Sequence, residues 1–236
     1  MDYVKEGKIE FCNPMEQYYP VELKNCVKNS STLYYRGDIS IINAYKNVAV
    51  VGSRKCSENG LKASYETGQI VAQLGLNLVN GLAIGCDTEA IRGALSMGGR
   101  CICILPCGLD LIQPKVNKKI AEEIIDNGGC LLSEYPIGTP VRKYQYVERD
   151  RLQSGISQGV LIIEAEEKSG TMHTIEYAQK QKKRLACYSY HLLKNATANK
   201  YLEEQNKAQI LKQKSDVLSY LKNVQTETYE QITLPI

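Results

Sequence analysis

The chain has 236 residues, of which 43% are hydrophobic and 23% charged, and its formal net charge is +3. This is the composition of a globular protein with room for one large α/β domain, and the charge neither requires nor excludes a nucleic-acid partner. No apolar run approaches the roughly 18 residues that a membrane-spanning helix needs, and the first residues lack the apolar core of a signal peptide. We therefore expect a cytoplasmic protein with no membrane partner.

The nine cysteines are an odd number and include no CxxC pair. Cys101 and Cys103 alternate with isoleucines, as small apolar residues do in a strand. His173 and His191 are the only histidines, too few to favour a metal site. The pattern predicts reduced, structural thiols, no bound metal and no cofactor.

Residues 1–47 are mixed and polar and predict an N-terminal arm. Residues 33–36 predict a short strand within it, and Gly37-Asp38 the turn that ends this strand. The arm is too short to form a domain of its own, so we expect it to pack on the rest of the chain.

Residues 48–51 are all apolar and mostly β-branched, and Gly52-Ser53-Arg54 follows at once. The run predicts a strand buried on both faces of a parallel sheet, and residues 57–74 predict a helix capped by one of the nearby serines. Free N–H groups and the helix dipole would then meet at one point, where Arg54 adds a charge suited to phosphate. We expect an anion site here; the alternative is an ordinary turn with a surface arginine.

Strands and helices alternate from residue 48 onward, which predicts an α/β fold with a mostly parallel sheet and helices on both faces. We assign residues 1–47 to the arm, 48–190 to the core and 191–236 to a C-terminal helical extension. Further strands are predicted at residues 76–79, 101–105, 130–132, 160–163 and 185–188, the last of these closing the sheet. Helices are predicted at residues 87–97, capped by Asp87 or Thr88, and at 116–126, 146–157, 170–182 and 216–221, with a long loop at 136–146.

Three loops leave predicted strands with small or polar residues, at the edge where such sheets bind ligands. Two of the loops carry a cation, Arg54 in the first and Lys168 in the third. Together they predict a phosphate-binding pocket. Its candidate residues are Gly52, Ser53, Arg54, Gly81, Gly85, Lys168, Ser169, Gly170 and Thr171.

Residues 142–151 form a basic stretch in which four cations outnumber two acids and tyrosines are interleaved. Cations suit the phosphates of a nucleic acid and aromatic faces suit unpaired bases, which is the pattern of single-strand binders. We add Lys143, Tyr146, Arg149 and Arg151 to the candidate site. The alternative is an exposed loop whose tyrosines pack inward.

These stretches resemble one bacterial family, the DNA-processing protein A family (DprA, also called Smf). They occur in the family's order and at plausible spacing over about residues 18–190, and the combination is highly specific. The matching positions are residues 33–38, 50–54, 81–83, Gly85, Asp87, 108–110, 131–136, Gly138, Thr139, Arg149, Arg151, Ser154, Gly155, Ser157, Glu164, Ala165 and 168–171.

The resemblance implies an extended Rossmann-like fold, binding of single-stranded DNA, a homodimer, and a role in transformation by loading recombinase RecA onto incoming strands. The chain departs from the family pattern where Ile84 stands in place of Arg, Ile91 in place of His, and Asp150 in place of Asn. It also lacks room for the helical and winged-helix domains that often flank this fold. We therefore expect a minimal or divergent member.

Two other functions fit parts of the sequence. A nucleotide-sensing Rossmann-like domain needs only a closed pocket, which Ile84 and Ile91 would suit. A phosphoribohydrolase-like enzyme would need a carboxylate pair such as Glu134 and Glu164, but its usual Pro-Gly-Gly motif is absent. No catalytic residue is assigned, and we expect a binding protein and not an enzyme.

Overall fold

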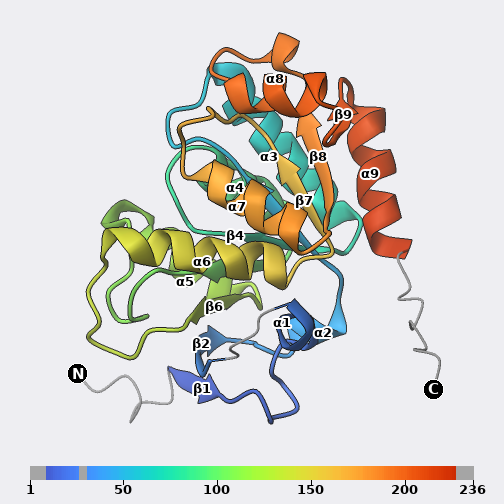
Figure 1. The fold of residues 1–236 in the computed structure, drawn as a ribbon. Coiled ribbons are helices and arrows are strands. Elements are labelled where there is room, and N and C mark those ends of the chain that lie inside the picture. The colour runs from blue at the N-terminus through green and yellow to red at the C-terminus, as the bar shows by residue number, and fades with distance from the viewer. Residues whose placement is uncertain (1–8, 27–30, 227–236) are drawn as a thin grey trace, which may run out of the picture.

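The computed structural model describes residues 9–26 and 31–226, and these form a single nine-stranded sheet with helices packed against it (Figure 1). Residues 1–8 of the predicted arm and 227–236 of the predicted extension lie outside the described residues. The strands are β1 (Glu10–Cys12), β2 (Leu33–Gly37), β3 (Asn47–Val51), β4 (Asn77–Asn80), β5 (Cys101–Ile104), β6 (Cys130–Ser133), β7 (Gly159–Ile162), β8 (Arg184–Tyr188) and β9 (Gln209–Leu211). The helices are α1 (Val21–Cys26), α2 (Ile41–Ala44), α3 (Glu58–Gln73), α4 (Cys86–Leu95), α5 (Lys118–Asp126), α6 (Lys143–Gly155), α7 (Thr171–Lys180), α8 (Thr197–Glu204) and α9 (Lys214–Thr226).

The strand order is β1-β2-β6-β5-β4-β3-β7-β8-β9. The strands from β6 to β9 in this order all pair in parallel, whereas β1 and β2 add an antiparallel edge next to β6. From β3 the chain builds outward through β4, β5 and β6, and it later returns to β7 on the other side of β3. The direction of winding therefore reverses between β3 and β7, which is where sheets of this kind leave a crevice for ligands.

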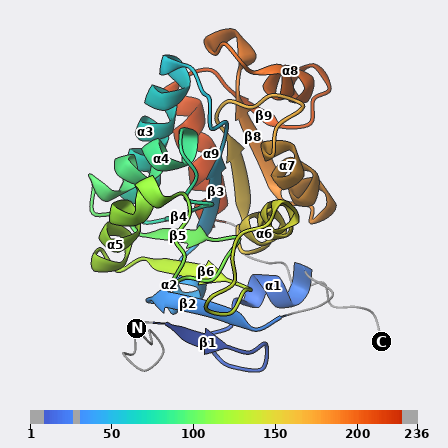
Figure 2. The same cartoon turned by 90° about the vertical axis from the view of Figure 1, so that its left-hand side faces the viewer.

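Helices cover both faces of the sheet, with α3, α4, α5 and α9 on one face and α1, α6, α7 and α8 on the other (Figure 2). The alternation of side chains along β3 explains this arrangement. Val48 and Val50 belong to the apolar core on the α3 side, whereas Ala49 and Val51 belong to the core on the α6 side. Every residue of β3 is buried, as expected for a strand with helices above and below it.

Helices α3 and α4 approach each other through glycines. A Cβ atom on Gly68 of α3 would lie 2.0 Å from the carbonyl oxygen of Ala90, and one on Gly93 of α4 would lie 2.0 Å from that of Tyr65. Only hydrogen fits in these gaps, so the two helix backbones are in direct contact. This contact fixes the start of α4 against the end of β3, next to the switch point.

The predicted fold class is confirmed, and the predicted strands from residue 48 to 188 lie within two residues of β3 to β8. One prediction about the sheet is wrong: Arg184–Tyr188 does not close it, because Gln209–Leu211 pairs beyond it as β9. The predicted loop at 136–146 also ends early, since α6 begins at Lys143. The basic stretch is thus mostly helical.

The start of α4 differs from the predicted one as well. Gly85 is its N-cap, with a φ of 82°, and neither Asp87 nor Thr88 caps the helix. The carboxylate of Asp87 instead accepts hydrogen bonds from the preceding loop.

The division into arm, core and extension stays a prediction. Among the described helices, none combines the length and apolar character that crossing a membrane requires.

Replacing Gly93 by alanine should destabilise the fold, because the new methyl group must push two helix backbones apart. We expect Gly93→Ala to lower the free energy of unfolding by roughly 2 kcal/mol, although alanine is the better helix former. Urea unfolding followed by circular dichroism measures this change. Arg92→Ala, on the exposed side of the same helix, is the control and should cost less than about 1 kcal/mol. Equal effects of the two changes would contradict the proposed backbone contact.

Candidate functional site

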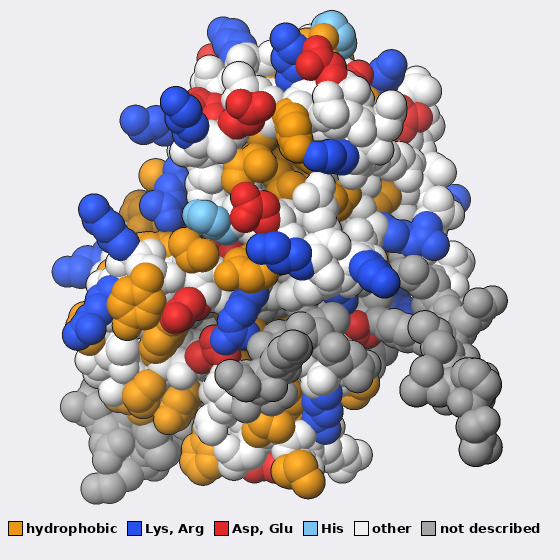
Figure 3. Space-filling view, in the orientation of Figure 1, with side chains coloured by type: hydrophobic (Ala, Val, Ile, Leu, Met, Phe, Trp, Pro, Cys, Tyr) orange, Lys and Arg blue, Asp and Glu red, His pale blue; other side chains and the backbone are white. Residues whose placement is uncertain are grey.

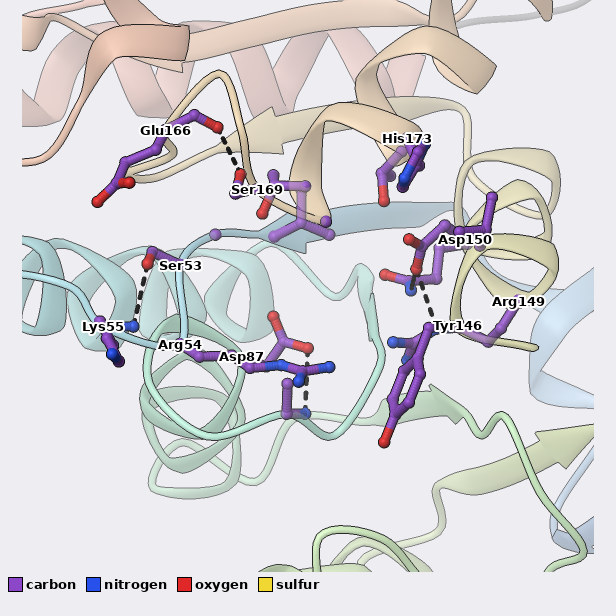
Figure 4. A pocket seen from close by; sticks show the side chains of 18 of the residues that line it. Ser53, Arg54, Lys55, Asp87, Tyr146, Arg149, Asp150, Glu166, Ser169 and His173 are labelled. Atoms are coloured by element: carbon purple, nitrogen blue, oxygen red, sulfur yellow. Dashed lines mark hydrogen bonds and ion pairs between the residues drawn. The ribbon is translucent and has the colours of Figure 1, made fainter. Parts of the chain in front are cut away.

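A cavity of about 480 Å³ opens at the switch point between β3 and β7 (Figure 4). This volume suits a small ligand or one unit of a larger one. The walls come from the loop after β3, the loop between β4 and α4, one side of α6, and the loop that leads into α7. The lining residues are Val51, Gly52, Ser53, Arg54, Lys55, Ala83, Asp87, Lys143, Tyr146, Val147, Arg149, Asp150, Gln153, Glu166, Ser169, Gly170, Thr171, His173 and Thr174.

The loop after β3 is pressed against the start of α4. A Cβ atom on Gly52 would lie 2.6 Å from Cys86 Sγ, and the Cys86 N–H donates to the carbonyl oxygen of Ser53 over 3.2 Å. Gly85 has a positive φ of 82° and would clash with the same oxygen if it carried a side chain. Glycine is therefore required at both positions to bring the first two walls together.

The start of α3 is already occupied by a carboxylate of the protein itself. Glu164 is fully buried at the end of β7, and it accepts hydrogen bonds from the Ser57 N–H (3.0 Å) and the Ser57 hydroxyl (2.6 Å). Ser57 in turn caps α3 by accepting from the Gly60 N–H. A helix start that holds an internal anion does not need an external one. The anion site expected at this helix start is therefore filled from within.

The start of α7, unlike that of α3, has backbone N–H groups that are not already bound by another described residue. The N–H groups of Gly170 and Thr171 donate to no acceptor among the described residues, and no side chain caps this ten-residue helix. Both residues line the cavity, as does Ser169. Unpaired N–H groups and the positive end of the helix dipole therefore point to this wall as the place for an anion.

Arg149 is buried and serves the architecture of the site. Its Nη1 donates to the carbonyl oxygen of Ile104 over 2.8 Å, and its Nε lies 3.0 Å from Asp150 Oδ1 in an ion pair that is not aligned as a hydrogen bond. The guanidinium passes under Gly81, where a Cβ atom would lie only 1.5 Å from Nη1. Gly81 is needed to leave room for this arginine. The charge of Arg149 is held below the loop and is not presented at the cavity mouth.

Asp87 organises the loop between β4 and α4. Its Oδ2 accepts hydrogen bonds from the N–H groups of Gly81 (3.0 Å) and Ala83 (3.2 Å). Burial raises the pKa of this carboxyl to about 6, and the nearby Arg149 charge and the two N–H donors limit that rise. The cavity thus has an acidic floor as well as a basic rim.

Tyr146 and Asp150 lie one turn apart on α6, on the wall that faces Arg54 (Figure 4). The Arg54 guanidinium stands 4.9 Å from the centroid of the Tyr146 ring, a cation–π contact at the cavity mouth. Asp150 is only 7% exposed, and burial raises the pKa of its carboxyl while Arg149, His173 and Arg54 oppose that rise. Asp150 therefore lies within electrostatic reach of Arg149, His173 and Arg54.

Most of the candidate residues line this one cavity. Four candidate residues do not line the cavity: Gly81, Gly85, Arg151 and Lys168. Gly81 and Gly85 allow the loops to close, Lys168 is exposed outside the lining, and Arg151 donates to both oxygens of Glu134 at 2.6 Å. The candidate residues among the lining are Gly52, Ser53, Arg54, Lys143, Tyr146, Arg149, Ser169, Gly170 and Thr171.

Several lining residues were not assigned to the site from the sequence. Val147 and Asp150 lie four positions after the assigned Lys143 and Tyr146, which would have placed them on the same face if the segment had been taken as a helix from its start. His173 and Glu166 carry no such signal. The remaining unassigned lining residues are Val51, Lys55, Ala83, Asp87, Gln153 and Thr174.

The carboxylate pair suggested for an enzyme is not assembled. Glu134 is bound by Arg151 and by the Ser31 hydroxyl, Glu164 holds the start of α3, and neither lines the cavity. Within the described part of the chain, no three His, Cys, Asp or Glu side chains are grouped so as to hold a metal ion.

Comparison with known proteins identifies the family. The profile of the family described as DNA recombination-mediator protein A matches residues 10–222. The chain belongs to this family. It is 35% identical to DNA processing protein DprA of Streptococcus pneumoniae over 167 residues, which cover 71% of this chain and 58% of that protein. It is 33% identical to protein Smf of Escherichia coli over 165 residues, 70% of this chain and 44% of that protein.

Solved structures agree with this assignment. The X-ray structure of DNA processing protein A from S. pneumoniae superposes with a TM-score of 0.80 at 30% identity, covering 93% of this chain and 78% of that one. DNA processing protein A from Helicobacter pylori, studied for its single-stranded DNA binding mode, gives 0.79 at 28% identity over 91% and 95%. The molybdenum cofactor carrier protein of Chlamydomonas reinhardtii, at 19% identity and 0.54, shares the fold alone.

The chain spans about half the length of the curated relatives it matches.

The two isoleucines that depart from the family pattern do not enter the cavity lining. Ile84 is 44% exposed on the loop before α4, and Ile91 is fully buried in the core. Neither isoleucine therefore forms part of the described walls of the cavity.

The raised pKa of Asp87 should make stability depend on pH. The folded state binds this proton more tightly than the unfolded state, whose carboxyl titrates near 3.8, so the wild type gains stability as pH falls from about 6 towards 4. Asp87→Asn removes the titration. The unfolding free energy of the wild type relative to the variant should rise by about 2 kcal/mol between pH 7 and pH 4. A difference that stays constant with pH in urea titrations would refute the assignment.

Proposed function

We propose that this protein binds single-stranded DNA through the cavity at the switch point. The observation that carries the proposal is the meeting, in one cavity, of unpaired N–H groups at the start of α7 with Arg54, Lys143 and the Tyr146 ring. Helix N–H groups and cations bind phosphates, and an aromatic face stacks on an unpaired base. The H. pylori relative, with its single-stranded DNA binding mode, supports the same reading.

The strand would leave the cavity over the start of α6. Arg142, Lys143 and Tyr144 are exposed there, the tyrosine by 52%. Figure 3 shows Lys and Arg side chains along the left edge of this face and across its top, with Asp and Glu between them. This distribution supplies cations beyond the cavity, which a strand needs and a single nucleotide does not.

We further propose that the protein acts in the cytoplasm during DNA uptake, as a homodimer that passes bound strands to the recombinase RecA. The family description, a recombination mediator, supports this role. The candidate dimer surface is the pair of later strand–helix units, residues 160–188. Since β7 is buried between β3 and β8, the side chains that this segment offers to a partner lie on α7 and on the loops before and after it.

A nucleotide sensor is the competing function, because the cavity volume would accept one nucleotide. The isoleucines that suggested a closed pocket do not close this one, since Ile84 lies exposed and Ile91 lies in the core. Competition by a mononucleotide at the concentration that saturates an oligonucleotide would favour the sensor.

Removal of Arg54 should weaken strand binding, since a cation at the cavity mouth and a stacking partner of Tyr146 are lost together. We expect Arg54→Ala to cost roughly 1–3 kcal/mol of binding free energy for an unstructured oligonucleotide in a fluorescence anisotropy titration. Arg92→Ala, which removes an equal charge from α4 outside the cavity, should bind as the wild type does. Equal affinities of the two variants would remove Arg54 from the site.

Binding should depend on salt concentration and should be stronger for single strands than for duplex DNA. Arg54, Lys55 and Lys143 are the cavity cations not committed to a buried ion pair, so about three phosphates are neutralised and log affinity should fall against log salt with a slope near −2. Lys143→Ala should make the slope shallower by about 0.7. Duplex DNA, whose bases stay stacked, should bind more weakly. A slope near zero, or equal affinity for duplex, would contradict strand binding.

A further inference from the structure

The cavity floor carries a carboxylate oxygen that accepts no hydrogen bond from the part of the chain that the structure describes. Asp150 Oδ1 accepts a hydrogen bond from Gln153 Nε2 (2.9 Å) and pairs with Arg149 Nε. Oδ2 accepts no hydrogen bond from the described residues. It is also absent from the buried side-chain atoms without a partner, so this oxygen is not enclosed by protein. Because Asp150 is a lining residue, this oxygen faces the cavity.

A phosphate cannot be the group that meets this oxygen. A carboxylate only accepts hydrogen bonds, and it repels a second anion, whereas the start of α7 and Arg54 attract one. Figure 4 shows Asp150 on the α6 side of the cavity and Ser53, Arg54 and Ser169 across from it. The site therefore has two unlike ends: one suits a phosphate, and the other suits a hydrogen-bond donor.

In a DNA strand the donors are the N–H groups of the bases, because deoxyribose lacks the 2′-hydroxyl. Asp and Glu pair with the N4 amino group of cytosine, whereas thymine and uracil place the acceptor oxygen O4 at the same position. The Tyr146 ring, one turn earlier on α6, is placed to stack on a base that reaches Asp150.

We propose that Asp150 gives the bound strand a base preference, selecting a base with an exocyclic amino group, cytosine before uracil or thymine. The inference rests on the proposed binding of single strands and assigns the orientation of the strand, with a base inside the cavity and phosphates at its rim. The asparagine that the family pattern has at this position can turn its amide to serve either base as donor or acceptor, so the preference belongs to the aspartate.

The test compares oligo-dC with oligo-dU of equal length, two pyrimidine strands that differ at the base edge and not in size. At mildly alkaline pH, where the carboxyl is ionised, the wild type should bind oligo-dC about threefold to tenfold more tightly, the range of one net hydrogen bond. Anisotropy competition at fixed salt measures the ratio. Equal affinities would overturn the role of Asp150, whereas failure to bind either strand would overturn the proposed function with it.

Two matched variants separate base reading from charge. Asp150→Asn should bring the ratio close to one, while Glu148→Gln, which removes the same charge from an exposed acid of α6 outside the cavity lining, should keep the wild-type ratio. A ratio that Asp150→Asn leaves unchanged would overturn the proposal, as would a ratio lost in both variants. If the asparagine variant does not fold, a wild-type ratio near one, or a ratio lost in Glu148→Gln, still overturns the proposal.

Discussion

The buried carboxylate of Glu164 is the interaction on which the site depends. It joins the end of β7 to the start of α3 through Ser57, and it also accepts from the Asn195 N–H before α8. Its backbone oxygen accepts from the Ser53 N–H over 2.7 Å. A carboxylate without water must satisfy its oxygens from the protein, so three loops are held to one residue. The crevice at the switch point keeps its shape because these loops cannot separate independently.

This internal anion also decides which helix serves the ligand. Both α3 and α7 begin at the switch point, and either could have offered its first N–H groups. Since Glu164 fills the start of α3, the uncapped start of α7 is left for an external anion. A substitution that removed Glu164 would therefore free a second anion site and loosen the walls of the first, so its effect on binding could not be read as the loss of a contact.

The parallel sheet could be predicted from the sequence. Fully apolar runs such as residues 48–51 and 160–163, in a chain with alternating helices, are typical of strands buried on both faces of such a sheet. The sequence was not sufficient for β9, which has three residues and little apolar pattern. Nor could it tell apart two kinds of arginine. Arg54 and Arg149 are both candidate site residues from the sequence, yet one is exposed at the cavity mouth and the other is 5% exposed beneath Gly81. Only the packing of α6 against the loop after β4 separates their roles.

The charges within the cavity explain why it should bind a two-ended ligand and not a simple anion. Asp87 and Asp150 are both buried, and burial raises the pKa of each carboxyl, so the protein spends stability to keep acids where a plain phosphate site would have none. Arg149 lies between them and offsets part of that cost, but its guanidinium is bound to Ile104 and Asp150 and cannot turn to a ligand. The floor is therefore an acceptor surface of fixed geometry, while the cations at the mouth are exposed and free to follow a backbone. Fixed acceptors below and exposed cations above suit a nucleotide unit that enters by its base and stays attached to a strand.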